Sequence, residues 1–96
     1  MTARETMERH LQAALEGKMD IVVGDLVPEM VPVLQQLAPK LGEIKPTSFE
    51  ILGERQEGDM VMVKATLVGK SRLTVEDSWK KQPDGSWKVV KIQPIE

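Results

Sequence analysis

The spacing of apolar residues changes near Ile44, and this change limits the possible folds more than any other feature of the sequence. Before Ile44, apolar residues recur at intervals of three and four, which is typical of amphipathic helices. After it, apolar and polar residues alternate, which is typical of strands with one buried face. Helices followed by strands predict an α+β fold. The length of 96 residues fits a single domain, residues 1–96, with one small core.

The first 17 residues predict an amphipathic helix with clear signals at both ends. Thr2 is placed to cap the helix, and Glu5, three residues later, completes a capping box. Gly17 is a natural stop because glycine readily adopts the left-handed conformation that ends helices. The predicted apolar stripe consists of Ala3, Met7, Leu11, Ala14 and Leu15.

Two more helices are expected before the change in spacing. A short one follows Asp20, which we expect to act as its N-cap. The next runs from about Pro28 to Leu41. Pro39 is expected to bend or shorten its end, and Gly42 is expected to stop it.

The alternating part predicts four strands joined by three-residue connections. The expected ranges are 46–55, 60–68, 72–81 and 87–95. The connection Pro83-Asp84-Gly85 is the strongest turn signal, because proline suits a type I turn and glycine suits the bulge that follows it. Short connections join antiparallel neighbours, so the sheet is expected to be a meander.

Loop lengths also predict the register of this meander. The pairs expected opposite one another include Ile51 with Val63, Leu67 with Leu73, Ala65 with Val75, Val61 with Trp79, and Trp79 with Val89. The inner face then holds Phe49, Ile51, Val61, Val63, Ala65, Leu67, Leu73, Val75, Trp79, Trp87 and Val89. The outer face carries an apolar patch of Met60, Met62, Val90 and Ile92, which predicts a homodimer interface. A slip of one residue at any loop would exchange the two faces.

Composition excludes several classes of chemistry. The chain has no Cys, no Tyr and one His, so it has no thiolate nucleophile, no thiolate metal site and no multi-histidine metal cluster. It also has no Gly-rich phosphate loop, nucleophile elbow, HExxH or Walker pattern. We therefore expect no metal and no cofactor. Any chemistry must use carboxylates and the one imidazole.

The net charge and the lengths of the apolar runs limit which partners and which cellular compartment can be expected. The net charge of −2 does not favour nucleic acid, because proteins that bind it usually present a basic face. No secretory signal is visible at the N-terminus, and no apolar run is long enough to span a bilayer. The expectation is a cytoplasmic protein without a membrane or nucleic-acid partner.

The sequence resembles the nuclear-transport-factor-2-like superfamily. The resemblance lies in the helices followed by a meander, which ends in Trp79 and the stretch Pro83-Asp84-Gly85-Ser86-Trp87-Lys88-Val89. The run Leu11 to Asp20 is similar to the first helix, break and second helix of that superfamily. The stretch from Pro28 to Lys45 followed by the meander is closest to a small domain found alone or ahead of α/β-hydrolases. The resemblance implies a cystatin-like cone, in which a curved sheet holds the helices on its concave face. Relatives such as ketosteroid isomerase and the polyketide cyclases are longer.

Asp77 is the leading candidate for chemistry, because it alternates with apolar residues on the predicted inner face. A carboxyl group in an apolar hollow has a raised pKa and can act as an acid or base, as in enzymes of this superfamily. The alternative is a cross-strand ion pair with Lys91, which the predicted register places opposite. His10 flanks the apolar stripe of the first helix. It is either a satisfied or half-exposed residue at the margin of the helix, or a partner of Asp77 in a dyad.

The other candidate site residues can also be explained by structural roles. Asp25 is expected to cap a helix or to face water. Trp79 and Trp87 are expected to complete the core, with ligand stacking as the alternative. The predicted ligand pocket lies between the first helix and the sheet and includes Leu11, Val63, Val75 and Trp79.

Three functions follow from these residues and the resemblance, of which the third is an accessory domain like the related domains that precede hydrolases. The first is a small non-catalytic homodimeric domain that binds a small apolar ligand or a protein partner. The alternative is a small isomerase or hydrolase of polyketide-cyclase type, with Asp77 as acid/base and His10 assisting.

Overall fold

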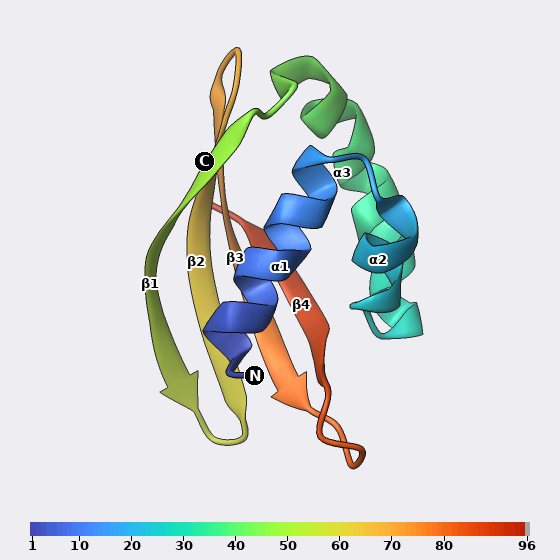
Figure 1. Ribbon diagram of the computed structural model, residues 1–96, viewed down its shortest axis with the longest axis vertical. Coiled ribbons are helices and arrows are strands. Elements are labelled where there is room, and N and C mark those ends of the chain that lie inside the picture. Colours follow the sequence, from blue (N-terminus) through green and yellow to red (C-terminus); the bar gives the residue numbers. More distant parts are fainter. Residues whose placement is uncertain (96) are drawn as a thin grey trace.

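The computed structural model describes residues 1–95 and has the predicted α+β arrangement (Figure 1). The helical part consists of α1 (Ala3–Leu15), α2 (Met19–Gly24), the short 3₁₀ helix η1 (Pro28–Met30) and α3 (Val31–Ile44). The strands are β1 (Ser48–Glu57), β2 (Met60–Val68), β3 (Arg72–Lys81) and β4 (Trp87–Pro94). They form one antiparallel sheet in the order β1-β2-β3-β4, which is the expected meander. Figure 1 shows α1 lying across the sheet, with α2 and α3 to its right.

Helix α1 has the predicted cap and buried stripe. The Thr2 hydroxyl accepts a hydrogen bond from the Glu5 backbone N–H at 3.1 Å, and the Glu5 carboxylate accepts one from the Thr2 N–H at 2.7 Å. Gly17 follows the helix with a φ of 75°, which glycine adopts without strain. Met7 and Leu11 are buried against the sheet, so the stripe anchors α1 to the core.

The ends of α2 and α3 differ from the prediction. Asp20 lies inside the first turn of α2 and is exposed, and Lys18 occupies the N-cap position. Helix α3 contains Pro39 and continues past Gly42 to Ile44, and Lys45 then adopts the left-handed conformation with a φ of 50°. Ile44 is completely buried. Its burial favours an extra turn at a place where the local sequence favours a stop.

The register is as predicted between β2 and β3, where Leu67 pairs with Leu73 and Val61 with Trp79. Between β1 and β2 it differs, because a bulge follows Ile51. Ile51 therefore pairs with Ala65 and not with Val63. A bulge adds one residue to one strand and shifts every later pair.

A second irregularity lies between β3 and β4. Trp79 pairs with Val89 as predicted, but the register shifts between Trp79 and Ser78. Ser78 then pairs with Lys91, and Asp77 pairs with Ile92. The prediction that Asp77 lies opposite Lys91 is therefore wrong.

The same shift changes the predicted dimer patch. Ile92 faces Asp77 on the inner side of the sheet, so its assignment to the outer face is wrong. Met62 is buried, and Met60 and Val90 are partly buried. The homodimer remains a prediction, with a smaller patch to support it.

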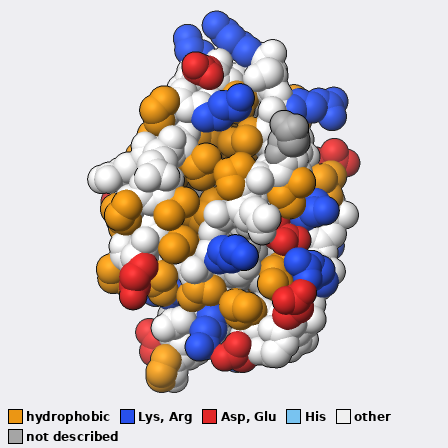
Figure 2. Space-filling view, turned by 180° about the vertical axis from the view of Figure 1, so that it is seen from behind, with side chains coloured by type: hydrophobic (Ala, Val, Ile, Leu, Met, Phe, Trp, Pro, Cys, Tyr) orange, Lys and Arg blue, Asp and Glu red, His pale blue; other side chains and the backbone are white. Residues whose placement is uncertain are grey.

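On the face turned away from the viewer in Figure 1, hydrophobic side chains gather in the upper and central part, with charged side chains around them (Figure 2).

The core lies between α1 and the inner face of the sheet. Its completely buried side chains include Met7, Ile44, Val63, Trp79 and Val89. Phe49, Ile51, Val61 and Trp87 pack against this cluster and are only partly buried. Within residues 1–95, no helix has the length and apolar character needed to cross a membrane.

Candidate functional site

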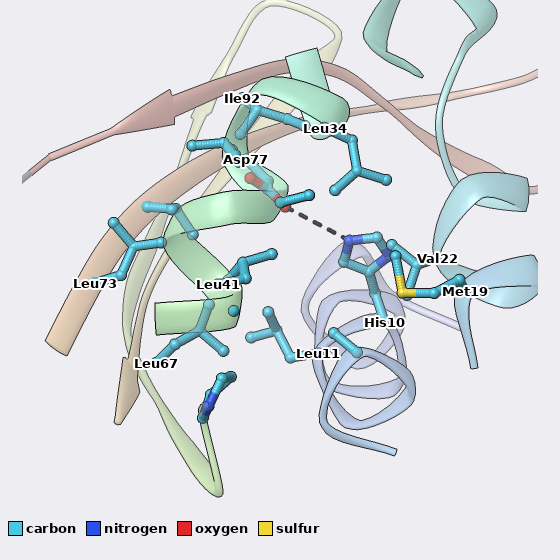
Figure 3. A pocket seen from close by; sticks show the side chains of 16 residues that line it. His10, Leu11, Met19, Val22, Leu34, Leu41, Leu67, Leu73, Asp77 and Ile92 are labelled. Carbon is cyan, nitrogen blue, oxygen red and sulfur yellow. Dashed lines mark ion pairs between the residues drawn. The ribbon is translucent and has the colours of Figure 1, made fainter. Parts of the chain in front are cut away.

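A cavity of about 300 Å³ separates the helices from one end of the sheet. Its walls come from α1, α2, α3 and the inner face of β2, β3 and β4 (Figure 3). The lining is almost entirely apolar, and among the described lining residues only two are ionisable, His10 and Asp77. The other lining residues are Leu11, Ala14, Met19, Val22, Leu34, Leu37, Ala38, Leu41, Gly42, Pro46, Leu67, Leu73, Val75 and Ile92.

Helix α3 forms the outer wall of this cavity. The side chains of Leu34, Leu37 and Leu41 lie on its apolar stripe and line the cavity, so they are only partly buried. Ile44 is the one residue of α3 that is fully buried. The apolar spacing of α3 therefore provides a cavity wall and not a tightly packed helix–sheet contact.

Asp77 projects from β3 to the edge of the cavity, and its residue is only 4% exposed. Its Oδ2 lies 3.9 Å from Nε2 of His10, which is too long for a hydrogen bond. Its Oδ1 has no hydrogen-bond partner among the described residues. Burial raises the pKa of Asp77 from its ordinary value of 3.8 to about 6, and the nearby His10 opposes part of this rise.

His10 lies between two carboxylates. Its Nδ1 is 3.0 Å from Oδ2 of Asp25, and its Nε2 faces Asp77 (Figure 3). The imidazole meets the indole of Trp79 edge to face, with ring centroids 5.4 Å apart. The residue is 6% exposed and is hydrogen-bonded to Asp25, so His10 is a satisfied residue, as one of the predicted alternatives has it, and is not half-exposed. The structure brings His10 and Asp77 together, and a catalytic role for either remains a prediction.

Asp25 is a neighbour of the candidate site whose contacts were not expected from the sequence. It is 6% exposed, and its two carboxylate oxygens accept hydrogen bonds from different partners. Oδ1 lies 2.6 Å from Nη2 of Arg9, and Oδ2 faces His10. The expectation that Asp25 faces water is therefore wrong; it does occupy the C-cap position of α2.

The position of Asp25 depends on a contact between distant parts of the chain. The Val89 N–H of β4 donates to the Asp25 carbonyl at 2.8 Å, and the Val27 N–H donates to the Val89 carbonyl at 3.1 Å. Leu26 forms an isolated parallel bridge with Val89. This docking holds the segment after α2 on the edge strand, where it meets α1.

The ion pair predicted between Asp77 and Lys91 does not form. The shift in the β3–β4 register turns Lys91 to the exposed position opposite Ser78. A hydrophobic residue, Ile92, takes the place opposite Asp77. Asp77 therefore has His10 as its nearest described charge partner and the cavity beside it.

The predicted pocket residues divide into two groups. Leu11 and Val75 line the cavity. Val63 and Trp79 are fully buried in the core and do not line the cavity. The indole of Trp79 contacts the His10 ring edge to face. Within residues 1–95, no three His, Cys, Asp or Glu side chains are grouped so that they could hold a metal ion.

Comparisons of the chain with protein-family models, with curated proteins and with solved structures found no match. The function must therefore be argued from the geometry of the cavity. An apolar cavity with one buried acid and one imidazole can bind an apolar molecule with a polar end, and it can move a proton.

Proposed function

We propose that this chain is a nuclear-transport-factor-2-like domain that binds a small, largely apolar molecule in the cavity, with Asp77 contacting its polar end. The observation that carries the proposal is the buried carboxyl group of Asp77 in the cavity lining, which makes no hydrogen bond to the described residues. A buried polar atom without a partner costs about 1–3 kcal/mol. Such groups are rare in native proteins, and a functional role is one of the explanations for them.

The size and lining of the cavity support this proposal. A volume of about 300 Å³ is at the lower end of the range for small-molecule sites. Such sites combine apolar walls with a few polar groups that fix the orientation of the ligand. Here the walls are apolar side chains, mainly leucines, and the polar groups are Asp77 and His10.

The proposal predicts that 2-naphthol, a small bicyclic alcohol, raises the melting temperature of the protein. At a probe concentration about 100 times Kd, the gain in unfolding free energy is about 3 kcal/mol. Ala14→Met places a larger side chain in the cavity and is expected to weaken binding at least tenfold. The matched control Gln12→Met adds the same side chain at an exposed position of α1 and is expected to leave binding unchanged. Thermal-shift and fluorescence titrations measure both effects. Absence of any shift, or equal loss in both variants, would contradict the proposal.

A second candidate function is proton transfer by a small isomerase or hydrolase of polyketide-cyclase type. The observation that favours it is the 3.9 Å approach of His10 to Asp77, whose pKa of about 6 is near the pH at which a general acid or base works best. Asp77 would take or give the proton, and His10 would assist.

This second function predicts that the protein accelerates exchange of the α-hydrogens of 2-tetralone in D₂O, as followed by NMR. Asp77→Asn keeps the shape of the side chain and removes the acid, so it should lower the exchange rate to that of buffer. If wild-type protein and buffer exchange at the same rate while 2-naphthol binds, the site binds molecules without moving their protons.

A further inference from the structure

Helix α3 is attached to the rest of the fold mainly at its two ends. Ahead of it, the Val27 N–H donates to the Val89 carbonyl of β4 at 3.1 Å. At its end, Ile44 is completely buried, and its carbonyl accepts a hydrogen bond from the Lys70 N–H at 2.7 Å. Among the described residues, no hydrogen bond or ion pair joins residues 31–43 to another helix or strand.

The middle of α3 is also packed less closely than α1. Six of the 13 residues of α1 are buried, whereas Ile44 is the one buried residue among the 14 of α3. Leu34, Leu37 and Leu41 line the cavity and are only partly buried (Figure 3). A helix in a protein owes most of its stability to the packing of its apolar face. We therefore expect α3 to open more readily than α1.

The sequence of α3 makes its middle easy to unwind. Pro39 lies inside the helix and has no N–H to donate to the carbonyl of Gln35, four residues earlier. Gly42 follows within one turn, and glycine favours a helix less than most residues do. Met30, at the N-cap position, makes no side-chain capping bond, whereas α1 has a complete capping box. These features predict that residues 31–43 open while the rest of the chain stays folded.

The cavity reaches the surface beside this helix. Three of its lining residues are exposed, Met19 at the start of α2 and Ala38 and Gly42 on α3. The lining residues of β2 and β3, such as Leu67 and Val75, are buried. An outward movement of α3 would therefore widen the rim of the cavity and leave α1 and the sheet in place.

We propose that α3 is a strap over the cavity: residues 31–43 open and close while both ends of the helix stay docked, and the bound molecule enters and leaves through this opening. The entry of a molecule by this route rests on the proposed small-molecule function, whereas the opening of α3 does not. A molecule in the cavity offers the three leucines apolar surface to contact, so it favours the closed position. The strap therefore sets how fast a molecule binds and is released.

Amide hydrogen exchange measures the opening of α3 in the protein without a ligand. We expect the amides of residues 33–43 to exchange at least about tenfold faster than the buried amides of α1, with little dependence on urea, because the opening exposes little surface. At a 2-naphthol concentration about 100 times Kd, exchange in α3 should slow about 100-fold, because the closed form alone binds. Equal exchange rates in α1 and α3, or exchange in α3 that bound 2-naphthol does not slow, would overturn the inference.

Two exposed prolines of α3 provide a matched pair of variants. Pro39→Ala restores the missing N–H inside the helix, so it should lower the open fraction at least about tenfold. Pro32→Ala is the control, because proline is compatible with the first turn of a helix. In stopped-flow fluorescence with 2-naphthol, Pro39→Ala should slow both association and release and leave Kd nearly unchanged. Pro32→Ala should alter neither rate.

The two rates distinguish a strap from a rigid wall. The closed form predominates in both proteins, so a variant that only hinders opening changes the path to the complex and not its stability. Rates in Pro39→Ala equal to those of the wild-type protein would overturn the role of α3 in entry. If 2-naphthol does not bind, the proposed function fails and entry by this route fails with it. The exchange rates of α3 then still decide whether the helix opens.

Discussion

The Asp77→Asn variant is expected to gain about 3 kcal/mol of stability relative to the wild-type protein between about pH 4 and pH 7. The folded protein holds the pKa of Asp77 at about 6, whereas the unfolded chain has the ordinary value of 3.8. Between these values the folded state keeps a proton that the unfolded state has lost. Rising pH therefore destabilises the wild-type protein through this group, and the loss is complete above the folded pKa. Asparagine does not ionise, so the unfolding free energy of the variant does not fall with rising pH through this residue.

Urea unfolding at several pH values measures this difference. The wild-type protein and Asp77→Asn should have similar unfolding free energies near pH 4 and should diverge as the pH rises. Asp20→Asn is the matched control, because it removes a negative charge from an exposed position on α2. A difference between wild type and Asp77→Asn that stays constant with pH would show that Asp77 ionises in the folded protein as it does in water.

The second large effect is expected at Gly69, in the connection between β2 and β3. A Cβ atom at this position would lie 2.3 Å from the carbonyl oxygen of Ile44 and 2.5 Å from that of Lys45. These are backbone atoms that cannot move aside alone, and the Lys70 N–H also donates to Ile44. Gly69→Ala is therefore expected to lower the unfolding free energy by about 1–3 kcal/mol.

Gly42→Ala is the matched control for Gly69→Ala. Gly42 lies inside α3, and a Cβ atom added there has no heavy atom within 4 Å. Alanine favours the helix over glycine by about 0.5–1 kcal/mol, so this variant should be more stable than the wild type. Denaturant unfolding compares the two. Equal effects of the two substitutions would contradict the close approach of the end of α3 to the β2–β3 connection.

Local signals were sufficient to predict most elements of this fold. The capping pair Thr2 and Glu5 acts through neighbouring backbone groups, so it can be identified from a few residues. Alternation of apolar residues predicted β2 and β3 with their observed ranges, 60–68 and 72–81. These features depend on the chain's own spacing and not on distant contacts.

The candidate site was harder to predict because distant contacts form it. A one-residue register shift beside Ser78 is enough to turn Lys91 away from Asp77 and to place Ile92 there. Asp25 reaches His10 only because the segment after α2 docks on β4. Nothing in the spacing of these residues reveals such docking.

The most direct test of ligand binding in the cavity is an NMR measurement of contacts between 2-naphthol and the methyl groups of the protein. We predict intermolecular nuclear Overhauser effects from the naphthalene ring to the methyl groups of Leu34, Leu41 and Ile92, which line the cavity. Asp77→Leu should keep these contacts while 2-naphthol binds more weakly. Contacts confined to Met60, Met62 or Val90 on the outer face of the sheet would contradict the proposed function and place the binding site outside the cavity.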